Sequence, residues 1–483
     1  MRDDTNLDPA NWDELRANGH QMLDDILDYI QHIRERPVWQ PIPGEIRDRF
    51  RSPAPAAESD LAAVHREFIE NILPFSTGNV HPGFMGWVHG GGNPAGMLGE
   101  MLAAGLNANL GGRDHMPIEV ERQITRWVRE IFGFPEEATG LFVTGTSMAN
   151  LIAVLVARTA ALGVSSRRTG IKDLQHQLVA YTSCAAHECV AQALEISGIG
   201  SDALRLIKTD HMHRMDTGAL ERSIASDRRE GLLPFLVVGT VGSVDIGAID
   251  DLAAIAQVAG NEKVWFHVDG AYGALAMLAP EISARLKGIE SADSIAFDFH
   301  KWGQVPYDAG FVLVRDGTLH HDTFASRPGY LARNARGLAG GSPWPCDFGP
   351  DLSRGFRALK TWFTLKVHGT EKIGAVIAKT CSLAQYLESK IAGEPELELL
   401  APAQLNIVCF RYRSDDSDRV NSEIVAALHE SGIAAPSVTT LSGQVAIRAA
   451  IVNHRTEVRD VDALVQAALE IGAKVAKGRS CHA

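Results

Sequence analysis

The sequence predicts an α/β protein built around a mostly parallel β-sheet. Between residues 141 and 314, short apolar runs rich in β-branched and aromatic residues alternate with helical patterns at the spacing of β-α-β units. Residues 232–239 form a near-continuous apolar run, which is typical of a central parallel strand buried on both faces. Residues 264–268 and 294–297 are apolar runs that end abruptly in polar residues. Such residues line the ligand crevice of a parallel sheet, because they follow the carboxyl ends of its strands.

The composition is that of an ordinary globular protein. The chain has 483 residues, of which 45% are hydrophobic and 22% charged. This length suits two or three domains and a core that needs no disulfides. The net charge is −13 and no basic patch dominates, which argues against a nucleic-acid partner.

The six cysteines indicate a reducing compartment. They show no C-x-x-C or histidine-paired spacing, so we expect free thiols and no metal site. The first residues, M-R-D-D-T-N, contain no apolar run, and no stretch reaches the roughly 18 uncharged apolar residues of a membrane span. The expected location is therefore the cytoplasm, with no membrane partner.

Residues 1–80 are expected to form an N-terminal helical segment. Residues 11–33 have helical spacing of apolar side chains, Pro37 ends that pattern, and residues 59–72 form a second helix. The stretches P-I-P-G and S-P-A-P-A-A are typical of extended linkers. Such a helix packs either on a second subunit or on its own domain, and the residues alone leave both arrangements open.

A large domain is expected over residues 81–367, and it begins with the Gly-rich segment H-P-G-F-M-G-W-V-H-G-G-G. Glycines allow the backbone to approach a ligand closely, although such a loop is usually a simple turn. Farther on, the sequence G-T-S-M-A-N separates a strand over 141–144 from a strong helix over 151–162. Thr146 and Ser147 then lie at a helix N-terminus, which suits a phosphate group or, more simply, a helix cap.

The remaining elements follow in the order of a β-α-β protein. Residues 178–181 form a strand, His187 opens the next helix, and a helix over 250–258 leads back to the strand over 264–268. Residues 315–347 have many glycines and prolines and little periodicity, which is typical of a long functional loop. A smaller C-terminal α/β domain is expected over 368–483. The other expected elements are strands over 310–314 (possibly antiparallel), 406–412 and 445–451, and helices over 373–391, over 420–428 and from 458.

An acid and a lysine follow two of these strands. Asp269 ends the run over 264–268, while Asp298, His300 and Lys301 end the run over 294–297. Pyridoxal 5'-phosphate (PLP) requires such a pair, namely an amine for its aldehyde and a carboxylate that keeps its ring nitrogen protonated. Taken singly, each residue has a plainer interpretation, because such an acid is usually a turn or cap residue and such a lysine is usually on the surface.

The contexts D-G-A-Y and H-K-W, with the tracts S-C-A-A-H-E-C-V and L-S-R-G-F-R-A-L-K-T-W-F, resemble the group II PLP-dependent amino-acid decarboxylases. That family includes aromatic-amino-acid, histidine and glutamate enzymes, and the resemblance runs from about residue 7 to about residue 473. It implies a fold type I large domain with a seven-stranded, mostly parallel sheet. It also implies a small-molecule amino-acid substrate and a homodimer, held by the N-terminal segment, with active sites at the subunit interface.

The resemblance assigns roles to the catalytic residues. Lys301 bonds the PLP aldehyde, Asp269 pairs with the ring N–H, and Ala271 packs closely against the ring. The imidazole of His187 stacks on the pyridine face and helps to place the substrate carboxylate. Tyr330, in a mobile loop, returns a proton to the decarboxylated intermediate.

The resemblance also implies where the phosphate and the substrate bind. Thr146 and Ser147 hold the phosphate, with help from Asp298 or His300. The substrate side-chain pocket is lined by Trp87, Val88, His89 and Gly90.

Two residues depart from the family pattern. Val244 lacks the hydroxyl of many relatives, which puts one polar contact near the ring in doubt. Asp298 stands where many relatives have Asn, and because a carboxylate repels a phosphate we expect Asp298 to contact a donor instead.

The favoured function is decarboxylation of an aromatic L-amino acid to its amine and CO₂, because the Asn-Gln pair typical of acidic-substrate enzymes is absent near residues 87–89. One alternative is a decarboxylase for an acidic or other amino acid. Others are a PLP-dependent aldehyde synthase and a carbon–carbon lyase. A remote alternative is a non-catalytic α/β binding protein.

Overall fold

Residues 139–314 are organised around a seven-stranded sheet. The computed structural model describes residues 6–172, 175–326 and 333–478. The strand order is β2-β8-β7-β6-β5-β3-β4. All neighbours from β7 to β4 pair in parallel, whereas β8 runs antiparallel to β7 and β2. The predicted α/β class and mostly parallel sheet are confirmed. The strands are β2 (Thr139–Val143), β3 (Leu178–Ser183), β4 (Leu204–Ile207), β5 (Leu233–Thr240), β6 (Trp265–Asp269), β7 (Ser294–Asp298) and β8 (Gly310–Val314).

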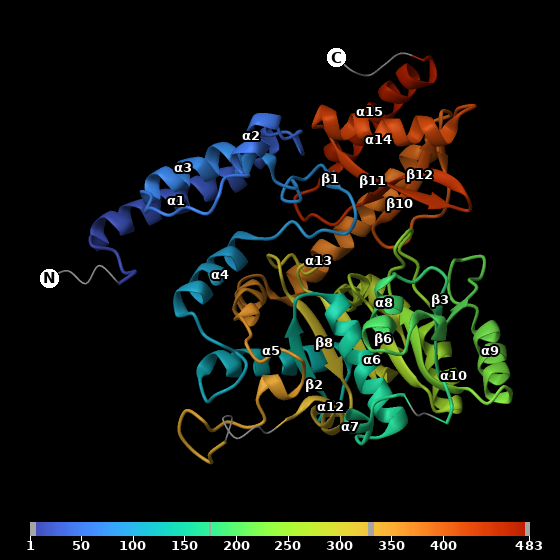
Figure 1. The fold of residues 1–483 in the computed structure, drawn as a ribbon. Helices are drawn as coiled ribbons and strands as arrows, with labels where there is room; N and C mark the ends of the chain where they lie inside the picture. Colours follow the sequence, from blue (N-terminus) through green and yellow to red (C-terminus); the bar gives the residue numbers. More distant parts are fainter. Residues whose placement is uncertain (1–5, 173–174, 327–332, 479–483) are drawn as a thin grey trace.

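Helices cover both faces of this sheet (Figure 1). Because successive side chains of a strand point to opposite faces, each strand contributes to two apolar layers. On one face, Val238 and Ala296 pack against α6 (Thr146–Leu162) and its neighbours α8 (Cys189–Ile196) and α12 (Gly317–Phe324). On the other face, Phe266 and Phe297 pack against α5 (Met116–Phe132), α9 (Thr217–Arg229) and α10 (Leu252–Glu262).

A second, five-stranded sheet lies in the C-terminal part, with the order β1-β11-β12-β10-β9. Its edge strand β1 (Phe84–Met85) follows the N-terminal helices and pairs in parallel with β11 (Ala435–Leu441). The long helix α13 (Arg357–Gly393) joins the two sheets and is kinked at Gly369, beside the boundary expected at residue 368. The division into domains stays a prediction. The other elements here are β9 (Leu397–Leu399), β10 (Ile407–Tyr412), β12 (Gln444–Ala450), α14 (Ser417–Ser431) and α15 (Val458–Ala476).

The N-terminal helices form an arm at one side of the molecule (Figure 1). It consists of α1 (Trp12–Gln31), α2 (Gly44–Arg49) and α3 (Leu61–Asn71), and α4 (Pro94–Leu106) follows on the chain. No residue of α1 is buried, and Trp12 is exposed. None of the described helices is long and apolar enough to cross a bilayer.

The described parts of the segment over residues 315–347, namely 315–326 and 333–347, contain more structure than its composition suggested. They contain α12, whose N-terminus is capped by Asp316 through a 2.9 Å bond from the backbone N–H of Leu319. Just beyond it, Arg354 and Glu121 form a fully buried ion pair at 2.6 Å, which ties the start of α13 to α5. The remaining short helices are α7 (Ser166–Thr169) and α11 (Pro280–Ser283).

Candidate active site

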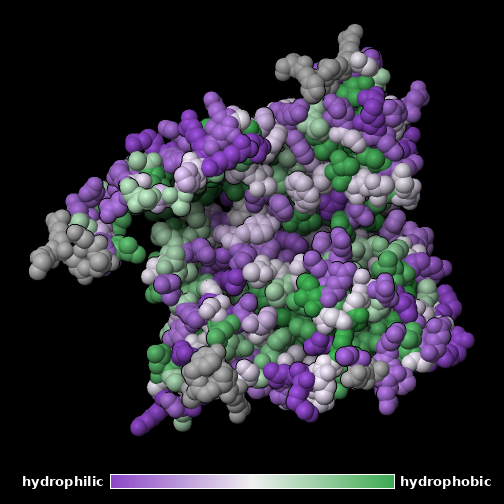
Figure 2. All heavy atoms as spheres, in the orientation of Figure 1, coloured by the Kyte–Doolittle hydropathy of each residue, from purple (hydrophilic) through white to green (hydrophobic). Residues whose placement is uncertain are grey.

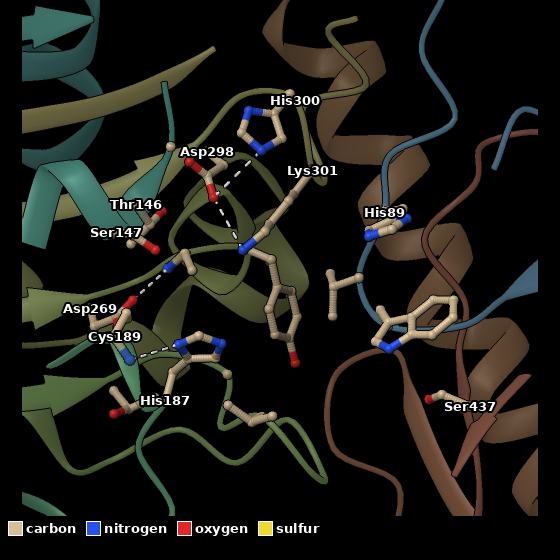
Figure 3. Close-up of a pocket in the computed structure, with 18 of the residues that line it drawn as sticks. His89, Thr146, Ser147, His187, Cys189, Asp269, Asp298, His300, Lys301 and Ser437 are labelled. Carbon is tan, nitrogen blue, oxygen red and sulfur yellow. Dashed lines mark hydrogen bonds and ion pairs between the residues drawn. The ribbon is translucent and has the colours of Figure 1, made fainter. Parts of the chain in front are cut away.

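A cavity of about 530 Å³ lies beyond the carboxyl ends of β5, β6 and β7. Its wall is completed by residues 87–89 and by residues from β11 and β12. Most of the predicted site residues line it: Trp87, Val88, His89, Thr146, Ser147, His187, Asp269, Ala271, Asp298, His300 and Lys301. Gly90 does not line the cavity, and Tyr330 lies outside the described residues. The parallel sheet therefore brings together residues that are far apart in the sequence (Figure 3).

The turn after β7 holds Lys301 beside an acid. Lys301 Nζ lies 3.1 Å from Asp298 Oδ2, so the expectation that Asp298 contacts a donor is confirmed. His300 Nε2 lies 3.7 Å from the same oxygen, and His300 Nδ1 accepts the backbone N–H of Ala309. Burial lowers the pKa of His300, so the ring is neutral near pH 7 and carries its proton on Nε2, toward Asp298.

Asp269 ends β6 and is nearly fully buried. Its Oδ1 accepts the backbone N–H of Ala271, and its Oδ2 accepts a bond from Asn150 Nδ2 at 3.0 Å. The thiol of Cys189 lies 3.7 Å from the same Oδ2, and burial raises the pKa of that thiol, which keeps it protonated. A carboxylate held by several donors is suited to pair with a cationic N–H.

His187 lies on the cavity wall close to Asp269 and Cys189 (Figure 3). It precedes α8, which begins at Cys189 rather than at His187. Its Nδ1 accepts the backbone N–H of Cys189 at 3.1 Å. In the neutral ring the proton therefore lies on Nε2, and this bond fixes the orientation of the imidazole.

The N-terminus of α6 faces the cavity next to Asp298. Gly145 precedes the helix without a side-chain cap, and a Cβ placed there would lie 3.7 Å from Asp298 Oδ1. Thr146 Oγ1 and Asp298 Oδ1 are buried, and neither has a hydrogen-bond partner among the described residues. A bound phosphate would accept a hydrogen bond from the Thr146 hydroxyl at the helix N-terminus, but it would leave the acceptor Asp298 Oδ1 unpaired.

These residues fit PLP. Lys301 offers an amine for the aldehyde, Asp269 a carboxylate for the ring nitrogen, and the α6 N-terminus donors for the phosphate. Asp298 is the one feature that opposes the fit, because it places a carboxylate at the phosphate end.

Aromatic side chains form the wall opposite the sheet. Phe84 and His89 are stacked, with ring centroids 5.6 Å apart, and His89 is likewise stacked on Trp87. Tyr307 meets His89 edge-on at 6.0 Å and also contacts the ring of His300. Burial and the nearby Lys301 lower the pKa of His89, so its ring is neutral. This wall accepts a flat, uncharged side chain.

Sequence reasoning missed several residues of the site. Tyr307 and Arg448 line the cavity, and Asn150 and His267 support Asp269 from behind. One signal was available for His267, because it lies two residues before Asp269 and so points to the same face of the sheet. No local pattern marked the other three.

Known proteins resemble the chain over nearly its whole length. Residues 43–413 match the family model for the pyridoxal-dependent decarboxylase conserved domain. An aromatic-L-amino-acid decarboxylase of Bacillus atrophaeus is 34% identical, over 93% of each chain. A phenylacetaldehyde synthase of Arabidopsis thaliana is 30% identical, over 94% of this chain and 95% of that one. The crystal structure of Oryza sativa TDC with PLP and tryptamine has a TM-score of 0.88 and 25% identity, and covers 98% of this chain and 100% of that one.

The family match spans both the strand ends that carry Asp269 and Lys301 and the helix that carries Thr146, which are the residues that fit PLP in the structure. The chain therefore belongs to the pyridoxal-dependent decarboxylases and is a PLP-dependent carboxy-lyase of fold type I.

Proposed function

We propose that this enzyme decarboxylates an aromatic L-amino acid to the corresponding amine and CO₂. The observation that carries the proposal is the aromatic wall of Trp87, His89 and Tyr307, which lines the same cavity as Lys301. Phe84 stacks on His89 and supports this wall without lining the cavity. The 34% identical relative, an aromatic-L-amino-acid decarboxylase, supports it.

The charges of the cavity disfavour an acidic substrate side chain. Arg448 lines the cavity, but its Nε and Nη1 already donate to the backbone carbonyls of Asp245 and Trp87, each at 3.0 Å. The carboxylate of Asp245 lies in the same wall and would repel a second acid. An uncharged ring meets neither problem.

The proposed roles of the described residues follow from their positions, whereas that of Tyr330, which lies outside them, rests on the family resemblance alone. PLP, when bound, supplies the electron sink that accepts the electrons of the broken Cα–carboxylate bond. Lys301 binds the cofactor covalently, Asp269 holds the ring N–H, and Thr146 and Ser147 hold the phosphate. His187 presents Nε2–H to the substrate carboxylate and orients that bond. Tyr330 is proposed to return the proton to Cα.

We also propose that the active unit is a homodimer. The arm, α4 and the start of α5 leave large apolar side chains in contact with solvent, among them Trp12, Met101, Leu106 and Met116. Figure 2 shows hydrophobic side chains on this part of the surface. A second copy of the chain would bury these side chains. Light scattering should give the mass of a dimer for the native protein, and the double variant Trp12→Glu and Leu106→Glu should lose it. A cytoplasmic location remains part of the proposal.

The decisive experiment is release of labelled CO₂ from each common amino acid, with product analysis. Tyrosine, tryptophan or phenylalanine is expected to give the highest rate, and Lys301→Ala should abolish it. A highest rate with glutamate or aspartate would contradict the proposal.

A second candidate is an aldehyde synthase, because a phenylacetaldehyde synthase is 30% identical over nearly the whole chain. The two activities differ in their products. Amine without ammonia or peroxide supports the decarboxylase, whereas aldehyde with ammonia supports the synthase.

A further inference from the structure

Behind Asp269, on the side away from the cavity, lies a chain of four buried or half-buried polar side chains. Trp265 Nε1 donates to Ser294 Oγ at 2.9 Å, and Ser294 Oγ lies 2.8 Å from His267 Nδ1. His267 Nε2 lies 2.9 Å from Asn150 Oδ1, and Asn150 Nδ2 lies 3.0 Å from Asp269 Oδ2. His267, Asn150 and Ser294 are each at most 1% exposed, and neither His267 nor Asn150 lines the cavity.

Strand pleating explains why these groups meet. Residues 265, 267 and 269 of β6 point to one face of the sheet, and residue 294 of β7 points to the same face. That face is covered by α6, which carries Asn150. The polar chain therefore crosses from the sheet to the helix and back to the carboxylate.

The direction of these hydrogen bonds follows from the donors and acceptors available. Trp265 Nε1 can only donate, so the oxygen of the Ser294 hydroxyl accepts a hydrogen bond from it. The hydroxyl O–H is then free to donate a hydrogen bond to His267 Nδ1. His267 then carries its proton on Nε2 and donates to the Asn150 oxygen, which turns the Asn150 amide nitrogen toward Asp269. The opposite direction would turn the amide oxygen toward the carboxylate, which an ionised Asp269 would repel. Burial also lowers the pKa of His267 to about 4, so the ring stays neutral and keeps one donor and one acceptor.

We infer that His267 and Asn150 are positioning residues, which hold the Asp269 carboxylate in the correct orientation for the ring nitrogen of PLP. The inference rests on the proposed role of Asp269. His267 acts only through Asn150, and Asn150 donates directly to the carboxylate. A substrate never contacts either residue, so their effect should fall on kcat and on the cofactor, with little effect on KM.

The test compares three variants of the full-length enzyme. Asn150→Leu keeps the shape of the side chain but removes its donor, His267→Leu removes the donor to Asn150, and His267→Gln keeps a donor near the position of Nε2. Loss of a hydrogen bond to a charged group predicts a decrease in kcat and in PLP affinity of about 10- to 100-fold for Asn150→Leu. His267→Leu should show a smaller loss in the same direction, and His267→Gln should recover most of it.

Spectroscopy separates this role from a purely structural one. The visible absorbance of bound PLP, titrated with pH, reports the environment of the ring and should shift in Asn150→Leu and His267→Leu. The matched control is His320→Leu, because His320 is also fully buried and contacts Thr139 Oγ1 and the carbonyl of Phe348 away from the cavity. It should lower the melting temperature but leave the absorbance titration and kcat unchanged.

Two outcomes would overturn the inference. The first is an unchanged absorbance titration and kcat in Asn150→Leu, with Asp269→Ala still inactive. The second is an equal shift in His320→Leu. If Asp269→Ala itself bound PLP and turned over normally, the proposed role of Asp269 would fail instead. If His267→Leu does not fold, Asn150→Leu and His267→Gln still decide the question.

Discussion

Replacement of Asp298 by Asn should tighten the binding of PLP. The Asp298 carboxylate is paired with Lys301 at 3.1 Å, and the amine must leave this pair as a neutral group before it can bond an aldehyde. Two unit charges at that distance interact by about 5 kcal/mol at an effective dielectric constant of about 20. The Lys301 side chain is 25% exposed, and hydration of the separated ions offsets most of that attraction. A net gain of about 1–2 kcal/mol, or about 5- to 30-fold tighter binding, is expected for Asp298→Asn.

The assay is titration of the cofactor-free enzyme with PLP and, separately, with pyridoxal, which lacks the phosphate. If Lys301 is the cause, both ligands gain equally. If repulsion of the phosphate is the cause, only PLP gains. Asp308→Asn is the control, because Asp308 carries the same charge nearby but pairs with Arg357. Weaker or unchanged binding of PLP to Asp298→Asn would refute the reasoning. Unchanged binding would mean that the ion pair with Lys301 does not oppose the cofactor, and weaker binding would mean that the carboxylate itself helps to hold it.

Three further predictions concern stability. Arg354→Met leaves the buried carboxylate of Glu121 without its partner and should lower the free energy of unfolding, measured in urea, by about 3–5 kcal/mol. As a control, Arg16→Met breaks the exposed pair with Asp13 and should leave the urea midpoint of unfolding unchanged. Phe311→Ala removes the central ring of an aromatic cluster formed with Phe142, Phe297 and Phe299. It should lower the free energy of unfolding in urea by about 3–5 kcal/mol. Burial lowers the pKa of His320 from 6.5 to about 3. As the pH drops, the unfolded chain therefore protonates the His320 imidazole before the folded protein does. The free energy of unfolding should fall below about pH 6.5, by up to about 1.4 kcal/mol per pH unit. When the free energy of unfolding is measured from pH 7 to 5, it should fall less steeply in His320→Leu.

Several strands of the seven-stranded sheet were predicted well because they carry strong local signals. The run over 264–268 and the strand β6 (Trp265–Asp269) differ by one residue at each end, and Asp269 and Lys301 were found because strand ends of a parallel sheet converge. Strand β11 (Ala435–Leu441) was not predicted, because it contains a proline and is partly exposed. Its pairing with β1 joins residues about 350 positions apart, which no local pattern encodes.

Side-chain partners were harder to predict than strands. Asn150 lies within a helix and has the pattern of an ordinary polar residue, yet its amide meets a carboxylate 119 residues away. Tyr307 gave no signal either, because its role in the cavity depends on how the loop after Lys301 folds against residues 87–89. Such contacts arise from packing of elements that are distant in sequence.

The two ends of the cavity have different structural origins, and this bears on substrate choice. Asp269 pairs in register with Ala296, so the backbone of two central parallel strands fixes the spacing between Asp269 and the turn that carries Lys301. Trp87 and His89 of the aromatic wall instead follow strand β1, which is attached to the edge of the C-terminal sheet, whereas Tyr307 comes from the loop after Lys301. Substitutions at Trp87 or His89 can therefore reshape the substrate pocket without moving the groups that hold the cofactor. It follows that His89→Asn should change which amino acid is decarboxylated fastest while the absorbance of bound PLP stays the same, and a change in that absorbance would show that the two ends are coupled.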